Sequence, residues 1–146
     1  MIRECKDIAL INGISNHDDV RVGSGLGEDE VGDYTDALNN PNLVFLINDT
    51  MDAMTILEFK GPGIWEIHSL FLKTARGRRG IQIGKDMLEY MRVHRGAKII
   101  WGQTPIELRG ARLFNKWCGL ESVGYGVLPG IGPVEYFQIS FPPLNS

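Results

Sequence analysis

The chain has 146 residues, of which 43% are hydrophobic and 23% charged, a composition typical of a soluble globular protein. A chain of this length can bury roughly two-thirds of its unfolded surface in one core, so we predict a single domain over residues 1–146. No window approaches the ~18 apolar residues of a membrane span and no signal-peptide region is readable, so we expect a cytoplasmic protein with no membrane partner.

Charge is divided unevenly along the chain, although the net charge is only -3. Residues 1–60 hold twelve acidic and four basic side chains (net -8), whereas residues 61–146 hold six and eleven (net +5). A basic C-terminal part can indicate nucleic acid, but no nucleic-acid motif is present, and an anionic small molecule explains the basic cluster at least as well. We therefore expect no nucleic-acid partner. The cysteines and histidines are scattered, so no metal site is predicted.

The N-terminal third contains one predicted helix and one polar loop. Apolar residues from Ile8 to Ile14 predict a short helix that ends before Asn16. Glycine and acidic residues from Gly23 to Asp33 predict a loop, with a helical turn near 33–38. This acidic segment is either a solvated loop or a substrate lid, and as a lid it would suit a cationic amine.

A three-stranded meander follows the loop. Short apolar runs predict strands over Leu43–Ile47, Ala53–Phe59 and Ile64–Leu72. Asn48-Asp49-Thr50 and Gly61-Pro62-Gly63 supply the residues that turns require. We therefore expect three consecutive antiparallel strands.

The meander leads into a basic, glycine-rich turn and a helix. The turn contains Lys73, Arg76, Gly77, Arg78, Arg79 and Gly80. The helix is predicted from about Gly80 to Arg92 or His94. Glycines expose backbone N–H groups, the helix start carries partial positive charge, and arginines donate in pairs, so the turn could hold a phosphate. The alternative is a solvated basic turn.

The C-terminal part predicts a strand, a helix and a closing hairpin. The strand spans Lys98–Thr104, and Pro105 is predicted to open a helix over Ile106–Trp117. Strands over Leu120–Val127 and Val134–Phe141 close the chain. A strand–helix–strand crossover makes its two strands parallel, whereas hairpins are antiparallel. The predicted fold is therefore an α/β mixed central sheet of order β-β-β-α-β-α-β-β with an N-terminal helix.

This order, with the basic turn before the central helix, resembles the GNAT family, the Gcn5-related N-acetyltransferases, from about Leu43 to Ile139. Further matches are the strand ending Gln103-Thr104-Pro105 and the next helix ending in Gly119-Leu120. The segment Asn16-His17-Asp18, together with Glu66-x-His68 leading into Arg76-Gly77, resembles a phage-borne GNAT-like branch.

The resemblance implies acetyl-CoA as acyl donor and a set of cofactor-binding residues. Two splayed parallel strands, Glu66–Leu72 and Lys98–Thr104, would expose backbone groups to the pantetheine arm. The family motif Gln/Arg-x-x-Gly-x-Gly/Ala can be read from Arg79 or from Arg76, with a bulky residue in place of the middle glycine in both registers. The implied set is Phe71, Leu72, Lys73, Arg76, Gly77, Arg78, Arg79, Gly80, Ile81 and Gly84.

Acetyl transfer to an amine requires a general base and a proton for the leaving thiolate. Glu66 and His68 lie two apart on one strand and project from the same face, so they are the candidate bases. The alternative is that both only hydrogen-bond neighbours. Where the family often has asparagine and tyrosine, this chain has Leu108 and Phe114, and phenylalanine has no proton to donate.

The resemblance, weighed with these residues, implies two candidate functions. The first is an acyl-CoA-dependent N-acetyltransferase that transfers acetyl to a small-molecule amine or a protein amino group by direct attack. The alternative is a catalytically impaired GNAT-fold binding or phage head/virion assembly protein, with phage structural proteins as partners and a location in the host cytoplasm or virion. The closing hairpin is a candidate pairing edge for a homodimer.

Overall fold

The computed structural model describes residues 1–21 and 30–144, so most of the predicted loop at 23–33, including Glu28 and Asp29, lies outside the described residues. The strands are β1 (Arg3–Glu4), β2 (Leu43–Ile47), β3 (Ala53–Gly61), β4 (Ile64–Phe71), β5 (Ile99–Pro105), β6 (Glu121–Leu128) and β7 (Gly132–Ser140). The helices are α1 (Ile8–Ser15), α2 (Asp18–Arg21), α3 (Arg78–His94) and α4 (Arg109–Trp117), with short 3₁₀ turns η1 (Ala37–Asn39) and η2 (Lys73–Ala75).

The strands form one seven-stranded sheet of order β1-β2-β3-β4-β5-β7-β6. Every neighbouring pair is antiparallel except β4 and β5, which are parallel because the chain crosses between them through α3. The predicted mixed α/β sheet is confirmed. The strand β1 was not predicted, since two residues carry no readable periodicity and gain their place by pairing with the end of β2.

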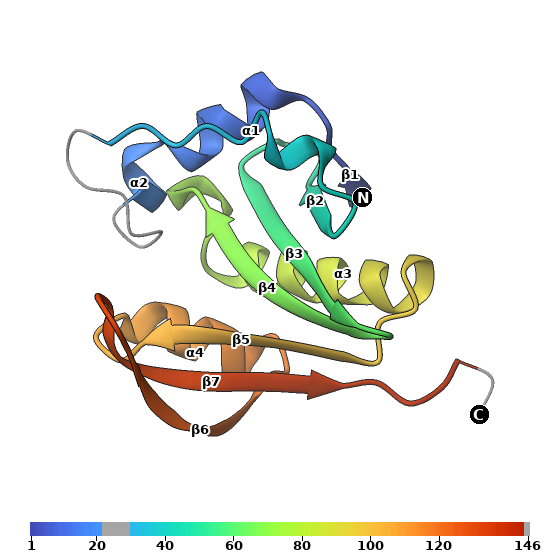
Figure 1. Cartoon of the computed structure of the whole chain (residues 1–146), viewed down its shortest axis with the longest axis vertical. Helices are drawn as coiled ribbons and strands as arrows, with labels where there is room; N and C mark the ends of the chain where they lie inside the picture. Colours follow the sequence, from blue (N-terminus) through green and yellow to red (C-terminus); the bar gives the residue numbers. More distant parts are fainter. Residues whose placement is uncertain (22–29, 145–146) are drawn as a thin grey trace.

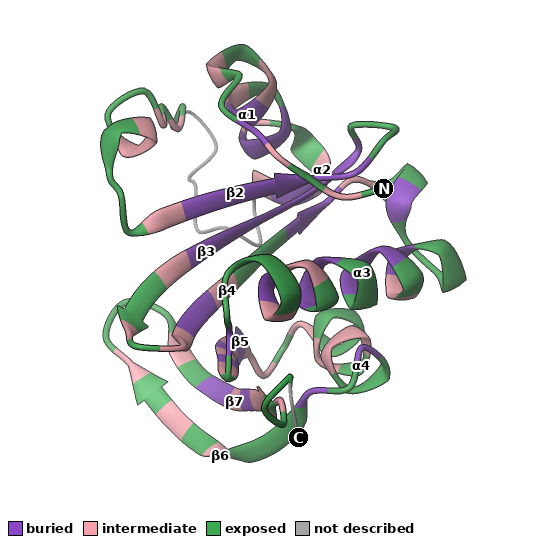
Figure 2. Ribbon diagram, turned by 90° about the vertical axis from the view of Figure 1, so that its right-hand side faces the viewer, coloured by how far each residue is buried: buried purple, intermediate pink, exposed green. Residues whose placement is uncertain are grey.

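Helices cover both faces of the sheet (Figure 1). On one face, α3 and the end of α4 bury a core that includes Leu57, Phe71, Met87 and Phe137. On the other face, α1 and α2 pack Ile11, Ile14 and Val20 against the middle strands. Figure 2 shows that buried residues concentrate on β2–β4 and on one side of α3, whereas β6 is largely exposed.

Helix α3 starts earlier than predicted. Its apolar residues Ile83, Met87, Leu88 and Met91 recur at helical spacing and are all buried. The helix begins at Arg78 instead of about Gly80, because Gly77 adopts φ 80° and ends the extended segment before it. The basic residues Arg78 and Arg79 therefore belong to the first helical turn.

The helix predicted from Pro105 also differs from α4. Pro105 is the last residue of β5, paired with Val134 of β7, so the strand continues one residue further than predicted. Leu108 N–H then donates to the Pro105 carbonyl in a turn, and the helix starts at Arg109. Sheet pairing with β7 outweighs the tendency of proline to open a helix.

No helix in the described ranges 1–21 and 30–144 is long and apolar enough to cross a lipid bilayer. The closing hairpin leaves β6 at one edge of the sheet, with Val123, Tyr125 and Val127 exposed. Pairing of this edge with a second copy remains a prediction.

Candidate active site

The strands β4 and β5 separate part-way along their length. Only Ile64–Glu66 pair with Ile99–Trp101, and the last pair is Glu66 with Trp101. Beyond it the strands diverge (Figure 1), and β5 stays paired with β7 on its other side. Beyond this pair the facing edges of β4 and β5 therefore lack strand-to-strand hydrogen bonds, which is the arrangement that the GNAT resemblance implied.

Glu66 and His68 lie together at the point where the strands separate. Glu66 is only 7% exposed, and the His68 Nε2 atom lies 3.5 Å from its Oε2 atom. A third residue, Lys60, was not predicted; its Nζ atom lies 3.4 Å from Glu66 Oε1 and 3.2 Å from Glu58 Oε1. The pairing of Glu58 with Glu66 across β3 and β4 creates this cluster.

Among the described residues, three members of this cluster are arranged so that they could hold a metal ion. Glu58, Glu66 and His68 each offer a ligand atom within 4.8 Å of the others. Carboxylate and imidazole ligands suit several divalent metals. The Lys60 ammonium lies against both carboxylates, however, and already supplies the positive charge that a cation would bring.

The backbone groups of Phe71, Leu72 and Lys73 already have partners within the chain. The Phe71 carbonyl accepts from Arg76 Nε at 3.1 Å. The Leu72 N–H donates to the Asp52 carbonyl at 2.9 Å, and the Lys73 N–H donates to Asp19 Oδ2 at 2.8 Å. A pantetheine contact through either N–H would require one of these bonds to break.

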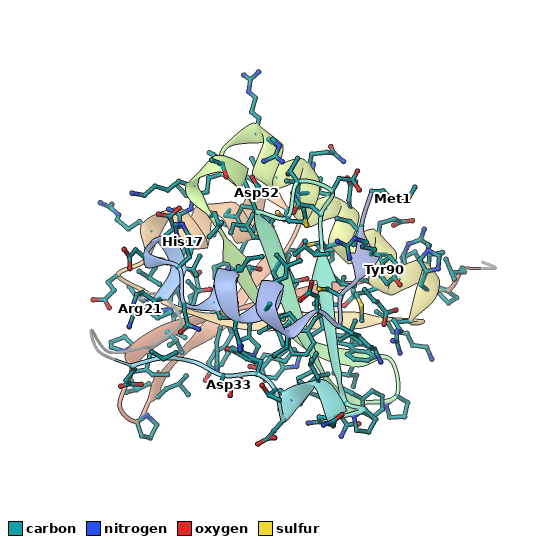
Figure 3. All side chains as sticks on the ribbon, turned by 90° about the horizontal axis from the view of Figure 1, so that it is seen from above. Met1, His17, Arg21, Asp33, Asp52 and Tyr90 are labelled. Carbon is teal, nitrogen blue, oxygen red and sulfur yellow. The ribbon has the colours of Figure 1, made fainter. Side chains whose placement is uncertain are left out.

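Arg79 is held by a carboxylate that the sequence did not single out. Its Nη1 atom lies 3.0 Å from Asp52 Oδ2 and 2.9 Å from the Thr74 carbonyl. Asn48, Thr50 and Thr74 also donate to Asp52. Figure 3 labels Asp52 beside the start of α3. Asp52 thus ties the β2–β3 turn to the basic turn.

The hydrogen bonds to Asp52 also set its charge. Burial raises the pKa of this carboxyl, but donation from Arg79, Asn48, Thr50 and Thr74 outweighs burial, so the pKa lies well below its ordinary value of 3.8. Asp52 is therefore ionised whenever the protein is folded at neutral pH.

The other two arginines of the turn differ in role. Arg76 donates through Nη2 to the Asp19 carbonyl at 2.7 Å and thereby holds α2 against the turn. Arg78 is exposed, and its side chain has no partner among residues 1–21 and 30–144. Of the three predicted phosphate-binding arginines, Arg78 alone has a guanidinium that no other side chain or carbonyl of the described residues occupies.

The first turn of α3 offers backbone donors. No side chain caps Gly77, and the first N–H with a partner inside the helix is that of Ile81, which donates to the Gly77 carbonyl. The N–H groups of Arg78, Arg79 and Gly80 therefore have no partner inside the helix, and they lie at the positive end of the helix dipole. This favours the motif register that starts at Arg76.

Residues of the other register lie inside α3. The Gln82 side chain donates to Asp86 Oδ1 at 2.8 Å. Gly84 is buried, and a Cβ atom there would lie 2.6 Å from Cys118 Sγ and 3.0 Å from Phe114 Cζ. Gly84 thus permits close packing of α3 on α4.

Gly80 is required by the path of the basic turn. A Cβ atom at Gly80 would lie 2.3 Å from the Ala75 carbonyl oxygen, so Gly80→Ala must displace the backbone. We expect a loss of about 1–3 kcal/mol in the free energy of unfolding, measured by urea denaturation. Gly110→Ala is the matched control, because no atom lies within 4 Å of the added Cβ there. Equal stability of both variants would contradict this account.

No family model matches the sequence, and no curated protein matches it either. Solved structures do match. Spermidine N-acetyltransferase from Vibrio cholerae, in complex with CoA and spermine, aligns with a TM-score of 0.76 and 14% identity over 96% of this chain and 94% of that one. AAC(6')-Ib, in complex with paromomycin and acetyl-CoA, aligns with a TM-score of 0.76 and 14% identity over 96% and 92%.

A third neighbour is an acetyltransferase of the GNAT family from Bacillus anthracis, with a TM-score of 0.69 and 16% identity over 95% of this chain and 93% of that one. The chain has the GNAT fold. At these identities the likeness shows the fold alone. The neighbours give no support to a phage-borne branch or to phage structural partners.

At two positions, Leu108 and Phe114, this chain differs from the asparagine and tyrosine that the GNAT family often has. Phe114 packs edge-on against Phe71, with ring centroids 5.1 Å apart, and so joins α4 to the end of β4. Leu108 stands at the N-cap position of α4, and its side chain makes no capping hydrogen bond. Neither position offers a hydroxyl.

A buried ion pair, which the sequence did not reveal, fixes α4 on the sheet of this GNAT fold. Glu135 of β7 is fully buried, and its Oε1 atom lies 2.7 Å from Arg112 Nε. Burial raises the pKa of Glu135, but hydrogen bonds, including that from Arg112, outweigh it and keep the pKa below its ordinary value. Asn115 donates to Thr104 at 2.9 Å beside it.

A hollow of about 350 Å³ lies away from the splayed strands, beside β2. Its lining includes Leu43, Phe45 and the Glu4 carboxylate, which is bound by Arg95 and Tyr90. None of the described residues that line this hollow belongs to β4 or β5. The separation of β4 and β5 is the better candidate for the active site of this GNAT-fold chain.

Proposed function

We propose that this chain is an acetyl-CoA-dependent N-acetyltransferase that acts on a small-molecule amine. The observation that carries the proposal is the position of Glu66, a largely buried carboxylate at the last pair before β4 and β5 separate. Backbone groups that can hold an amide-rich arm and a base that can accept a proton thus meet at one point. The acetyltransferase activity named for the structural neighbours supports the proposal.

The acyl donor fits the residues present at the basic turn. The N–H groups of the first turn of α3, which have no partner inside the helix, and the guanidinium of Arg78 would bind its pyrophosphate. Arg76 and Arg79 would act indirectly, by holding the turn to Asp19 and Asp52. Acetyl-CoA supplies the activated thioester carbonyl.

Glu66 would accept a proton from the acceptor ammonium, directly or through water, with His68 beside it to share the charge. Direct attack of the amine is favoured over an acyl-cysteine, because Cys118 is buried and burial raises the pKa of its thiol to about 11. Since Phe114 has no proton, the leaving thiolate would be protonated by water or another group.

The second candidate function is a GNAT-fold binding protein without turnover. It is favoured by Phe114 and by the internal hydrogen bonds of Leu72 and Lys73. Release of free thiol from acetyl-CoA over a panel of amines separates the two functions. Amine-dependent release supports the enzyme, and binding of acetyl-CoA without release supports the binding protein.

Binding of the donor has its own test. Acetyl-CoA at millimolar concentration should raise the melting temperature, and Arg78→Ala should weaken binding about tenfold, since one charge-assisted contact is lost. The melting temperature of the free protein should not change, because Arg78 has no partner in the described chain. Arg3→Ala removes the same charge from the exposed strand β1 and should leave binding intact. No shift with the wild type would exclude donor binding.

A further inference from the structure

Lys60 occupies the position that an acceptor amine would take beside Glu66. Its primary ammonium, on β3, lies 3.4 Å from Glu66 Oε1 and 3.2 Å from Glu58 Oε1. These are contact distances for an alkylammonium held between two carboxylates. A Lys side chain is itself a primary alkylamine, chemically equivalent to the acceptors proposed above.

The position of Lys60 along β3, and not only its contact with Glu66, places its amine near the separated strands. Glu58 and Lys60 project from the same face of β3, and Glu58 is paired with Glu66. Glu66 in turn belongs to the last pair before β4 and β5 separate. Lys60 therefore lies next to the closed end of the splayed strands, toward which a thioester entering between them would point.

We propose that Lys60 is a self-acetylation site of this chain, modified within the same molecule with Glu66 as base. The inference rests on the proposed acetyltransferase function and adds to it a covalent modification at a defined atom. Glu66 takes a proton from the Lys60 ammonium. The Lys60 Nζ lone pair then forms a C–N bond with the acetyl carbonyl carbon as the C–S bond breaks. The second Nζ proton passes to solvent, which leaves a neutral amide, and CoA departs as a thiolate that is protonated by solvent.

The modification would also change the site. Acetylation removes the charge of Lys60, so Glu58 and Glu66 lose their shared cation. The two carboxylates are then available to an external ammonium. Self-acetylation would thus convert a site occupied by its own lysine into one open to a cationic amine.

The test is the rate of acetylation of each lysine, followed by peptide mass spectrometry after incubation with acetyl-CoA. Lys6 and Lys116, both exposed, are the internal references. Uncatalysed acetylation should disfavour Lys60, because hydrogen bonding to Glu58 raises its pKa and so favours the protonated amine. We expect Lys60 to be modified at least about tenfold faster than the reference lysines. This factor is smaller than the full rate enhancement that a general base can supply.

Three controls make the test decisive. Glu66→Gln should reduce the rate at Lys60 to that of the references, whereas Glu121→Gln, on exposed β6, should not. Circular dichroism verifies that both variants fold. The rate constant should be independent of protein concentration, and a rate proportional to concentration would overturn modification within one molecule.

The outcomes also separate this inference from the proposed function. Acetylation of amines in the panel, with Lys60 no faster than Lys6, overturns self-acetylation and leaves the enzyme in place. Absence of both reactions overturns both proposals.

A measurement without acetyl-CoA tests the underlying contact. After reductive ¹³C-methylation, the NMR titration of Lys60 should give a pKa above its ordinary value, and Glu66→Gln should lower it, since one of its two carboxylate partners is lost. A Lys60 titration unchanged by Glu66→Gln would contradict the contact on which the proposal depends.

Discussion

Glu66→Gln is expected to lower kcat/KM for acetyl transfer by about 10²–10³-fold, within the range that a general base contributes. Glutamine has nearly the same shape and still accepts a hydrogen bond, but it cannot take the proton from the acceptor ammonium. The affinity for acetyl-CoA should change little, because the basic turn lies at the far end of β4 from Glu66. Free-thiol release and the thermal shift measure the two quantities separately.

Two further variants sharpen this expectation. Glu121→Gln makes the same chemical change on exposed β6 and should leave the rate unchanged. His68→Gln should cost less than Glu66→Gln, because the His68 side chain is nearly half exposed and lies beside the proposed base without being the base itself. An unchanged rate in Glu66→Gln would remove Glu66 from the base role and favour the binding protein.

The sequence predicted the parts of this site that depend on local pattern. The alternation of Glu66 and His68 along one strand places both side chains on one face, and the structure brings them within 3.5 Å. The crossover through one helix makes β4 and β5 parallel, whereas their separation was implied only by the family resemblance. The glycines of the basic turn were also readable, since Gly77 needs a positive φ.

Contacts between distant segments could not be read in the same way. Asp19, Asp52 and Lys60 are ordinary charged residues in the sequence, and each gains its role from a partner brought close by the fold. For Asp52 the available signal was the turn chemistry of Asn48-Asp49-Thr50, which implied a tight turn but not its arginine partner. The basic turn therefore looked like three equivalent arginines, whereas two of them have structural partners.

Asp52→Ala is expected to lower the free energy of unfolding by about 2–3 kcal/mol near pH 7. Arg79, Asn48, Thr50 and Thr74 all lose their acceptor, in a region where Asp52 is buried. The loss is smaller than for a fully buried pair because the Arg79 side chain is 43% exposed. Asp49→Ala, in the same turn but at an exposed carboxylate, should cost under about 1 kcal/mol in urea denaturation.

The contribution of Asp52 to the free energy of unfolding should depend on pH, and the direction of that dependence follows from the lowered pKa. The pKa of Asp52 in the folded state lies below its ordinary value of 3.8, so folding favours the ionised form. The contribution is therefore complete above 3.8 and is lost as the pH falls below that value. The difference in unfolding free energy between wild type and Asp52→Asn should stay constant from about pH 7 to about pH 4 and shrink at lower pH. A difference that does not shrink would show that Asp52 stabilises the basic turn by shape alone, without its charge.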